Sequence, residues 1–358
     1  MLTVRVVRPS QLDADRLETW RRLQQSAAHL ASPFFSPEFA LVLDRVRNDV
    51  RVAVLQMSCG ECGFFAFQQR GRAGRALGYG ISDWQGIVAS PRLEVSAHEL
   101  LASCGLAVCR FDHLSEQDAK RLAPRAQRTQ SWIIDVGNDF RAYEEGRRTS
   151  SPGTFRSMSR KLRTMQRRHE VEFRWNDPDR SAFRTLVEWK SRQYLQTGRR
   201  NRFAQPWITG ALEELLESDA TGCAGVLSTL RLDGELAAVH FGIRSEHLLA
   251  CWFPAFSSQW GAYSPGLQLF WMMAEASSSK GVSRLDLGKG DERFKQILAN
   301  SSEPLAEADI TIPSVRAAAF RVRSAPLRQA RRFVLAHEGL RAAARRTLRG
   351  IGRIRQPS

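Results

Sequence analysis

Residues 248–298 read LLACWFPAFSSQWGAYSPGLQLFWMMAEASSSKGVSRLDLGKGDERFKQIL, and this stretch decides the fold. It predicts a strand, a loop closed by Ser264-Pro265-Gly266, a helix with an apolar face, a second strand, and a polar turn before a short helix. This order places the start of a helix, with unpaired backbone N–H groups and the positive end of its dipole, beside the end of a strand. Such a place binds phosphate groups without special side chains.

The same residues carry a resemblance to a known family. The run SPG before an apolar helix, followed by DLGKGDERFK at residues 286–295, resembles the GNAT-type cellulose- and exopolysaccharide-biosynthesis acetyltransferases. That branch is similar to the Fem-type aminoacyl transferases. The segment SDWQG at residues 82–86 resembles a segment of the same branch. The resemblance implies an acyltransferase that uses acetyl-CoA or another acyl-CoA as co-substrate.

Length and pattern predict the domain organisation. A chain of 358 residues is long for one core. Residues 1–150 predict the order β-α-α-β-β-β-α-β, and residues 151–312 repeat it, with an Asp-Gly hairpin turn at 233–234. We therefore expect an α/β protein of two tandem GNAT-like domains, each a mixed sheet flanked by helices. The polar stretch 135–153 is the expected connector, and residues 313–358 predict a basic helical tail.

Charge and cysteine content bound the partners and the compartment. The net charge is +16, but residues 313–358 hold twelve Arg and only one acidic residue, Glu338. The body is therefore mildly basic, and no nucleic-acid-reading motif accompanies the charge. We expect no nucleic-acid partner, and an anionic membrane surface remains open for the tail. The N-terminus does not resemble a signal peptide, so we expect a cytoplasmic protein, peripheral at the inner membrane face at most.

The C-x-x-C pair Cys59 and Cys62 flanks an expected hairpin turn. No second pair and no His pair completes a zinc set, so the spacing favours a structural role over a redox or metal site. We expect reduced thiols and no metal.

The donor site is expected at the helix start. Ser264, Pro265, Gly266 and Leu267 would hold the pyrophosphate of coenzyme A on amides of the first turn, and the alternative is an ordinary helix start. Strand backbone near residues 251–254, with Phe253, would polarise the thioester carbonyl.

Three residues are candidates for proton transfer. His240, in a predicted central strand, is the first choice for the base, because its reference pKa lies near neutrality. Asp286 is the second choice, and Tyr263 is the candidate acid for the leaving thiolate. The alternative for His240 is a hydrogen-bonded structural residue.

The acceptor is expected to be a sugar or a lipid-linked envelope precursor. Asp83 and Trp84 would grip a sugar, by hydrogen bonds and by ring stacking respectively, and the alternative is a turn with a core tryptophan. The resemblance implies that Lys289, Asp291 and Lys295 bind the acceptor or the acyl phosphate. The alternative for the last two is an i,i+4 surface pair.

The helix expected over residues 155–169 carries six basic residues and no acid. It predicts either a solvated face or a contact with anionic lipid. Two other functions stay open: a Fem-type transfer of an aminoacyl group from charged tRNA, and a non-catalytic scaffold in polysaccharide synthesis.

Overall fold

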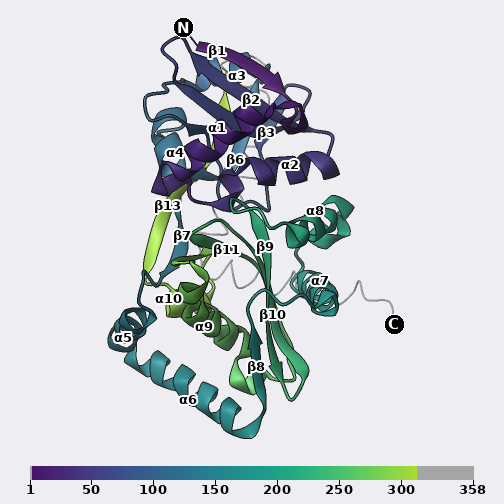
Figure 1. Ribbon diagram of the computed structural model, residues 1–358, viewed down its shortest axis with the longest axis vertical. Helices are drawn as coiled ribbons and strands as arrows, with labels where there is room; N and C mark the ends of the chain where they lie inside the picture. The colour runs from purple at the N-terminus through teal and green to yellow at the C-terminus, as the bar shows by residue number, and fades with distance from the viewer. Residues whose placement is uncertain (1, 313–358) are drawn as a thin grey trace.

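The computed structural model describes residues 2–312, and within them one sheet runs through the whole molecule (Figure 1). Its strands follow the order β1-β2-β3-β4-β6-β13-β7-β12-β11-β10-β9-β8, and β5 pairs with β3. The predicted tail, residues 313–358, lies outside the described residues, and so does its expected contact with a membrane.

The first half of the chain supplies seven strands: β1 (Leu2–Val7), β2 (Val50–Met57), β3 (Cys62–Arg70), β4 (Ala73–Ala76), β5 (Val88–Ala89), β6 (Val108–Ser115) and β7 (Gln127–Asp135). Its helices are α1 (Ala14–Gln25), α2 (Pro37–Val46), α3 (Ala97–Ser103), α4 (Glu116–Leu122) and α5 (Phe140–Ser150).

The second half supplies β8 (Val171–Arg174), β9 (Ala224–Leu232), β10 (Glu235–Arg244), β11 (Leu248–Phe256), β12 (Arg284–Lys289) and β13 (Ser301–Thr311). Its helices are α6 (Pro152–Arg168), α7 (Arg180–Gln196), α8 (Pro206–Glu217), α9 (Pro265–Ser277) and α10 (Arg293–Leu298). The repeated α/β order confirms the predicted fold class.

The two halves exchange their last strands. In the first half β4 runs parallel to β6, and in the second half β11 runs parallel to β12. The next strand is borrowed in each case, because β6 pairs with β13 and β12 pairs with β7. β13 and β7 then pair with each other at the centre of the sheet. The position of each half is therefore fixed by main-chain hydrogen bonds to the other.

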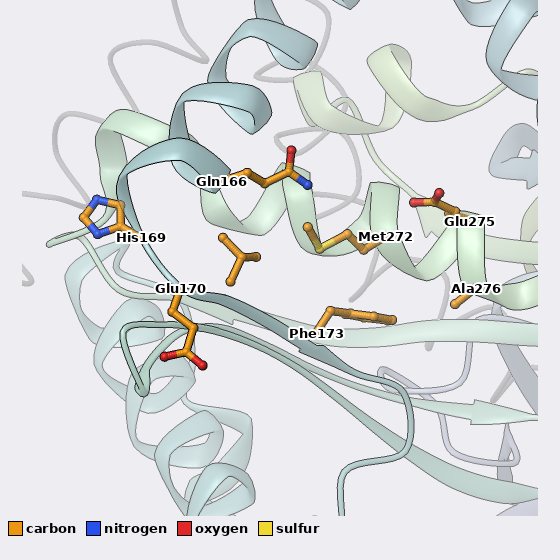
Figure 2. Close-up of a pocket in the computed structure, with 8 residues that line it drawn as sticks. Gln166, His169, Glu170, Phe173, Met272, Glu275 and Ala276 are labelled. Atoms are coloured by element: carbon orange, nitrogen blue, oxygen red, sulfur yellow. The ribbon is translucent and has the colours of Figure 1, made fainter.

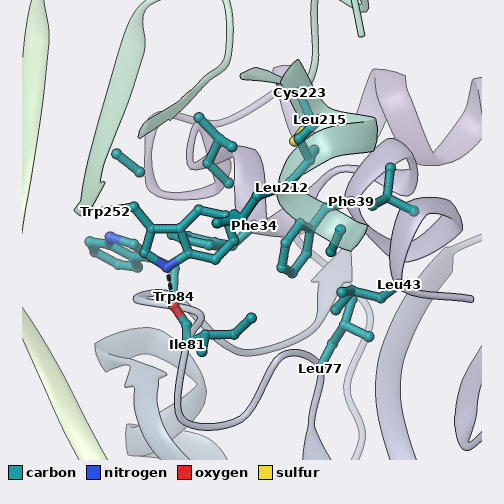
Figure 3. Packing of buried hydrophobic residues seen from close by; sticks show 14 of the residues in the cluster. Phe34, Phe39, Leu43, Leu77, Ile81, Trp84, Leu212, Leu215, Cys223 and Trp252 are labelled. Atoms are coloured by element: carbon teal, nitrogen blue, oxygen red, sulfur yellow. Dashed lines mark hydrogen bonds between the residues drawn. The ribbon is translucent and has the colours of Figure 1, made fainter. Parts of the chain in front are cut away.

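A shared apolar core also joins the halves (Figure 3). Phe34 and Phe39 come from the first half and pack on Trp252 of β11, with ring centroids 5.3 and 6.1 Å apart. The Trp252 indole donates a hydrogen bond to the main-chain oxygen of Ile81. Burying aromatic rings of this size contributes several kcal/mol, so we expect the halves to behave as one body.

Most predicted elements are confirmed, and the differences have local causes. Residues 135–153, expected as a connector, form the end of β7, helix α5 and the start of α6. The residue Ser151 between the two helices has an extended φ and is followed by a proline, which ends one helix and begins the next. Strand β4 stops at Ala76, because glycines at 78 and 80 take positive φ in a turn. Helix α4 and strands β7 and β13 were not predicted.

Cys59 and Cys62 lie at the turn between β2 and β3, as expected, and the described cysteines are all free thiols. Within residues 2–312, no helix combines the length and the apolar character that crossing a membrane requires.

Candidate functional site

A cleft of about 1370 Å³ opens between the halves and extends into the second one. Its walls come from the β3–β4 hairpin, the loop after α7, strand β11, the start of α9, and the turn between β12 and α10. The predicted residues Asp83, Phe253, Ser264, Pro265, Gly266, Leu267, Lys289 and Lys295 all line it. The structure thus gathers segments that lie more than 200 residues apart in the chain.

The cleft exists because two parallel strands diverge. β11 pairs with β12 only over Leu248–Ala250, although β11 continues to Phe256. From Cys251 onward the edge of β11 that faces β12 has no pairing with that strand. A β-bulge between Phe241 and Gly242 of the neighbouring β10 accompanies the divergence. Free strand edge inside a cleft offers main-chain groups to a ligand.

The start of α9 is open on the side of the cleft. Ser264 has left-handed backbone angles (φ 57°, ψ 55°) and makes no side-chain cap. Its main-chain oxygen accepts the N–H groups of Leu267 and Gln268 instead, at 2.9 and 3.1 Å. This corrects the expectation that the amide of Leu267 is available to a ligand. Pro265 has no N–H, so the amide of Gly266 is the one in this turn without a partner among the described residues.

A cation lies at this helix start. Lys161 of α6 donates from Nζ to the Ser264 Oγ at 2.8 Å. A positive charge beside the positive end of a helix dipole is unfavourable unless an anion lies between them. One residue of the predicted basic helix therefore lies at the start of α9.

The matching place in the first half is closed. Ser96 caps the first turn of α3, and the Glu99 side chain returns a hydrogen bond to the main-chain N–H of Ser96 in a capping box. Between β4 and β6, Gln85 fills the position that a ligand would take. Its main chain bridges to β6, and its Oε1 accepts the amides of Asp112 and His113. An open helix start beside diverging strands therefore belongs to the second half.

The end of β12 and the turn that follows it require their glycines. Gly288 and Gly290 have φ values of 73° and 134°, which side-chain-bearing residues rarely adopt. Lys295 is 7% exposed and donates from Nζ to the main-chain oxygens of Gly288 and Lys289 at 3.2 and 2.7 Å. It pairs with Glu292 at 3.3 Å. Lys295 therefore shapes the turn from within.

Lys289 and Asp291, the other two predicted binding residues near this turn, lie in different surroundings. Lys289 lines the cleft, but its Nζ is bound to the main-chain oxygen of Asp112 and to Glu307, at 2.7 and 2.8 Å. Asp291 is exposed and does not line the cleft, which corrects its expected role in binding the acceptor.

Asp83 is a carboxylate that lines the cleft beside this turn. A side chain on Gly288 would lie 3.3 Å from the Asp83 Oδ2, so the glycine lets the two segments approach. Burial raises the pKa of Asp83, the nearby His113 opposes that shift, and the charge of Asp286 adds to it. The His113 Nε2 lies 3.5 Å from the Asp83 Oδ1, and its Nδ1 lies 3.2 Å from Asp112. A carboxylate with a raised pKa in a cleft is a candidate for proton transfer.

The structure corrects the expected roles of Trp84 and Asp286. Trp84 is 8% exposed and packs edge-on to Phe35, so it presents no face for a sugar ring. Asp286 is 1% exposed and accepts hydrogen bonds from the Trp84 Nε1, the Ser131 hydroxyl and the Gly288 N–H. A carboxylate with both oxygens occupied in the core fixes the turn and is not a base for the cleft.

His240 is also corrected. It is fully buried, packs edge-on to Phe270 of α9, and is absent from the walls of the cleft. Burial, with a smaller effect from Lys190, lowers its pKa to about 3. A histidine that stays neutral and cannot reach the cleft is not the base.

Tyr263, the expected acid, does not line the cleft, and it contacts a residue of a separate groove. Its hydroxyl contacts the His169 Nε2 at 2.9 Å, and His169 contacts Asp233 at 2.6 Å. Figure 2 shows His169 at one end of this groove, which lies between the end of α6, β8 and α9. The groove shares no lining residue with the cleft, so Tyr263 does not face the diverging strands.

Sequence reasoning missed the basic wall of the cleft. Lys190 of α7 lines it, and Arg199, Arg200 and Arg202 follow in the next loop. Burial, with the charges of Arg199 and Arg202, lowers the pKa of Lys190 to about 8. The run RRNR after α7 was the available signal. Cys251 also lines the cleft, and burial holds its pKa well above the usual range, so its thiol is not an activated nucleophile.

Residues 153–296 match the family model of the acetyltransferase (GNAT) domain. The match covers α6 to α10 and so includes the open helix start, the diverging strands and the loop after α7. The second half is therefore similar in sequence to GNAT acetyltransferase domains. No curated protein matches the chain in sequence.

One solved structure supports the fold over both halves, and two others are similar to this chain. The C-terminal domain (DUF2156) of a proposed lysylphosphatidylglycerol synthetase from Agrobacterium fabrum has a TM-score of 0.55 and 15% identity, covering 88% of this chain and 96% of its own. A tandem GNAT protein from the clavulanic acid biosynthesis pathway has a TM-score of 0.47 and 11% identity, covering 88% and 100%. FemX has a TM-score of 0.48 and 9% identity, covering 73% and 87%. At these identities the likeness concerns the fold alone.

The described residues include no candidate metal site. Among residues 2–312, no three His, Cys, Asp or Glu side chains are grouped so that they could hold a metal ion.

Proposed function

We propose that this chain transfers an acyl group from an acyl-CoA thioester to an amine or hydroxyl of an acceptor bound between its halves. The observation that carries the proposal is the divergence of β11 from β12 beside the open start of α9. The GNAT match over residues 153–296 supports the same reading of these elements.

The residues present fit a phosphorylated thioester. The free amide of Gly266 and the Nζ of Lys161 lie at one helix start, where a pyrophosphate would accept a hydrogen bond from the amide and offset the charge of the lysine. Gly266 also keeps the approach open, because a Cβ there would lie 3.1 Å from the Phe256 ring. The free edge of β11 from Cys251 to Phe253 would donate to the thioester oxygen.

The reaction is direct transfer. The acceptor nitrogen or oxygen forms a bond to the thioester carbon, the carbon–sulfur bond breaks, and the acceptor loses a proton as the thiolate leaves. Asp83 is the proposed proton acceptor, because it lines the cleft and burial raises its pKa above the ordinary value of a carboxyl. His113 is proposed to position it from 3.5 Å. Asp83 thus replaces His240 and Asp286 as the base.

The acceptor is proposed to be a sugar or a lipid-linked precursor of an envelope polysaccharide, modified on the cytoplasmic side. The resemblance of residues 82–86 and 286–295 to polysaccharide-biosynthesis acetyltransferases is the support for this class. The proposed peripheral contact with an anionic membrane surface involves residues 313–358. A Fem-type transfer from charged tRNA is the second candidate function, since the cleft has a basic wall.

The test is calorimetric titration with acetyl-CoA, longer acyl-CoAs and aminoacyl-tRNA. A true donor at 100 times its dissociation constant stabilises the fold by roughly 2.7 kcal/mol, which a thermal shift also detects. Lys161→Ala should weaken acyl-CoA binding by about tenfold, as expected for one charge-assisted contact.

The matched control is Arg163→Ala. Arg163 lies on the same helix and carries the same charge, but it is exposed and makes no contact with the start of α9 in the described structure. Equal losses of acyl-CoA affinity in Lys161→Ala and Arg163→Ala would show that the loss comes from the general charge of the helix and not from the contact at the start of α9. Absence of binding by every acyl-CoA, together with salt-dependent binding of aminoacyl-tRNA, would replace the proposal with its second candidate.

A further inference from the structure

The cleft is lined by elements that cover opposite faces of the β9–β11 sheet. Neighbouring residues of a strand point to opposite faces, and on β10 His240 contacts Phe270 of α9 while Phe241 contacts Phe183 of α7. Helices α7 and α9 therefore cover different faces, as Figure 1 also shows. The helix start that would hold the donor belongs to the α9 face. The loop after α7 belongs to the other face, which leaves that side to the acceptor.

The acceptor side carries cations without counterions. The guanidinium groups of Arg199, Arg200 and Arg202 make no ion pair or hydrogen bond with any described residue, although all three line the cleft. Arg70 of the β3–β4 hairpin lines the opposite wall and is likewise unpaired within residues 2–312. Elsewhere the chain does pair such groups: Arg231 lies 2.5 Å from Asp179 and Arg21 lies 2.6 Å from Glu38.

A half-buried lysine adds to this positive charge. Lys190 lines the same wall, and its Nζ donates to the Gln193 Oε1 at 2.8 Å rather than to a carboxylate. Burial and the charges of Arg199 and Arg202 lower its pKa to about 8, while Glu292 opposes them and Lys295 adds to them. Cations held this close together repel one another unless an anion lies among them.

We propose that the acceptor carries a phosphate or diphosphate group, which binds between the loop Arg199–Arg202 and Arg70 while its amine or hydroxyl points to Asp83. This inference rests on the proposed acyl transfer and specifies its acceptor. Planar guanidinium groups bind phosphate oxygens in pairs, and several of them around one cleft favour a group with more than one anionic oxygen. A sugar phosphate and the headgroup of a lipid-linked sugar share this chemistry.

The test is the binding of inorganic pyrophosphate and of glucosamine 1-phosphate to the full chain in saturating coenzyme A, which occupies the donor side. Arg199→Gln with Arg202→Gln should weaken both ligands at least tenfold and leave the affinity for acetyl-CoA within about twofold. The matched control is Arg184→Gln with Arg192→Gln. These two arginines lie exposed on α7 and do not line the cleft. Their substitution removes the same charge, so the affinities for pyrophosphate, glucosamine 1-phosphate and acetyl-CoA should each change less than twofold.

A second arm distinguishes the sources of the phosphate. Vesicles of phosphatidylcholine with phosphatidylglycerol are added in the same assay. Displacement of pyrophosphate by these vesicles, dependent on Arg199 and Arg202, assigns the phosphate to a lipid headgroup. Binding of glucosamine 1-phosphate without any effect of the vesicles assigns it to a free sugar phosphate.

Three results would overturn the inference. The first is an equal loss of pyrophosphate affinity in the two double variants, and the second is a loss of acetyl-CoA affinity together with pyrophosphate affinity. The third is displacement of the bound pyrophosphate by tRNA alone. Its failure is distinct from that of the proposed function. If acetyl-CoA does not bind but pyrophosphate still requires Arg199 and Arg202, the anion site stands and the acyl transfer does not.

Discussion

Trp84 donates its indole N–H to the carboxylate of Asp286 at 2.5 Å, although the two residues are 202 positions apart. Trp84 belongs to the loop that also carries Asp83, and Asp286 begins the turn that carries Gly288. The bond therefore sets the distance between the proposed base and the end of β12. Both side chains are buried, so the contact is protected from competing water.

Asp286→Asn should destabilise the fold by about 1–3 kcal/mol. The carboxylate accepts hydrogen bonds from Trp84, Ser131 and Gly288, and an amide would turn an N–H group toward at least one of these donors. Urea unfolding measures the change in the free energy of unfolding. Asp219→Asn, at an exposed position, is the control and should change stability by less than about 0.5 kcal/mol. Equal stability of the two variants would contradict the role assigned to Asp286.

Asp83→Asn should lower kcat by about 10²- to 10⁴-fold, as loss of a general base does. In the wild type, activity should fall as the pH decreases through the pKa of Asp83, and burial places that pKa above the usual range of a carboxyl. The pH profile of kcat/KM for the glucosamine 1-phosphate reaction measures it. His113→Asn should shift the same limb of the profile without abolishing activity, because His113 acts through Asp83.

Asp83→Asn should also raise the free energy of unfolding at neutral pH. A carboxyl whose pKa is raised on folding favours the folded state below its unfolded pKa, and this contribution is lost as the pH rises through the folded pKa. Asn carries no charge to bury, so Asp83→Asn should be the more stable protein at pH 7 and gain nothing at pH 3. Identical unfolding curves of the two proteins at both pH values would show that Asp83 is solvated.

Lys190→Met should also stabilise the protein near neutral pH, by about 1–3 kcal/mol. The pKa of Lys190 falls from 10.5 to about 8 on folding, so the unfolded chain binds more protons between these values. The wild type should therefore gain stability as the pH rises from 8 toward 10, and Lys190→Met should not show that gain. Unfolding in urea at several pH values provides the measurement. Lys280→Met, at an exposed position, should keep the gain.

The sequence predicts the local structure at the start of α9 and at the end of β12 better than it predicts the opposite wall of the cleft. Ser264-Pro265-Gly266 and the glycines at 288 and 290 are local signals, because backbone angles and helix starts depend on neighbouring residues. The exchange of β7 and β13 depends on pairing between Ile133 and Ser301, which no local pattern specifies. The arginines after α7 form a wall only because the first half lies opposite them. A charge run in one sequence does not show what it faces.

The sequence does not show which face of β10 borders the cleft, and this explains why His240 was expected to be the base. Alternation along β10 predicts that His240 and Phe241 point apart, but not which of them faces the cleft. Both are fully buried, and both ring nitrogens of His240 lack a hydrogen-bond partner among the described residues. A buried polar group without partners costs about 1–3 kcal/mol.

His240→Leu should therefore stabilise the fold and leave acyl transfer within about twofold of the wild type. The pKa of His240 falls from 6.5 to about 3 on folding, so the unfolded chain binds more protons between these values. The wild type should lose stability as the pH falls from 6.5 toward 3, and His240→Leu should lose less. Urea unfolding at pH 7 and pH 5, with kcat at pH 7.5, measures both effects. A hundredfold loss of kcat in a folded His240→Leu protein would restore the histidine as the base and remove Asp83 from that role.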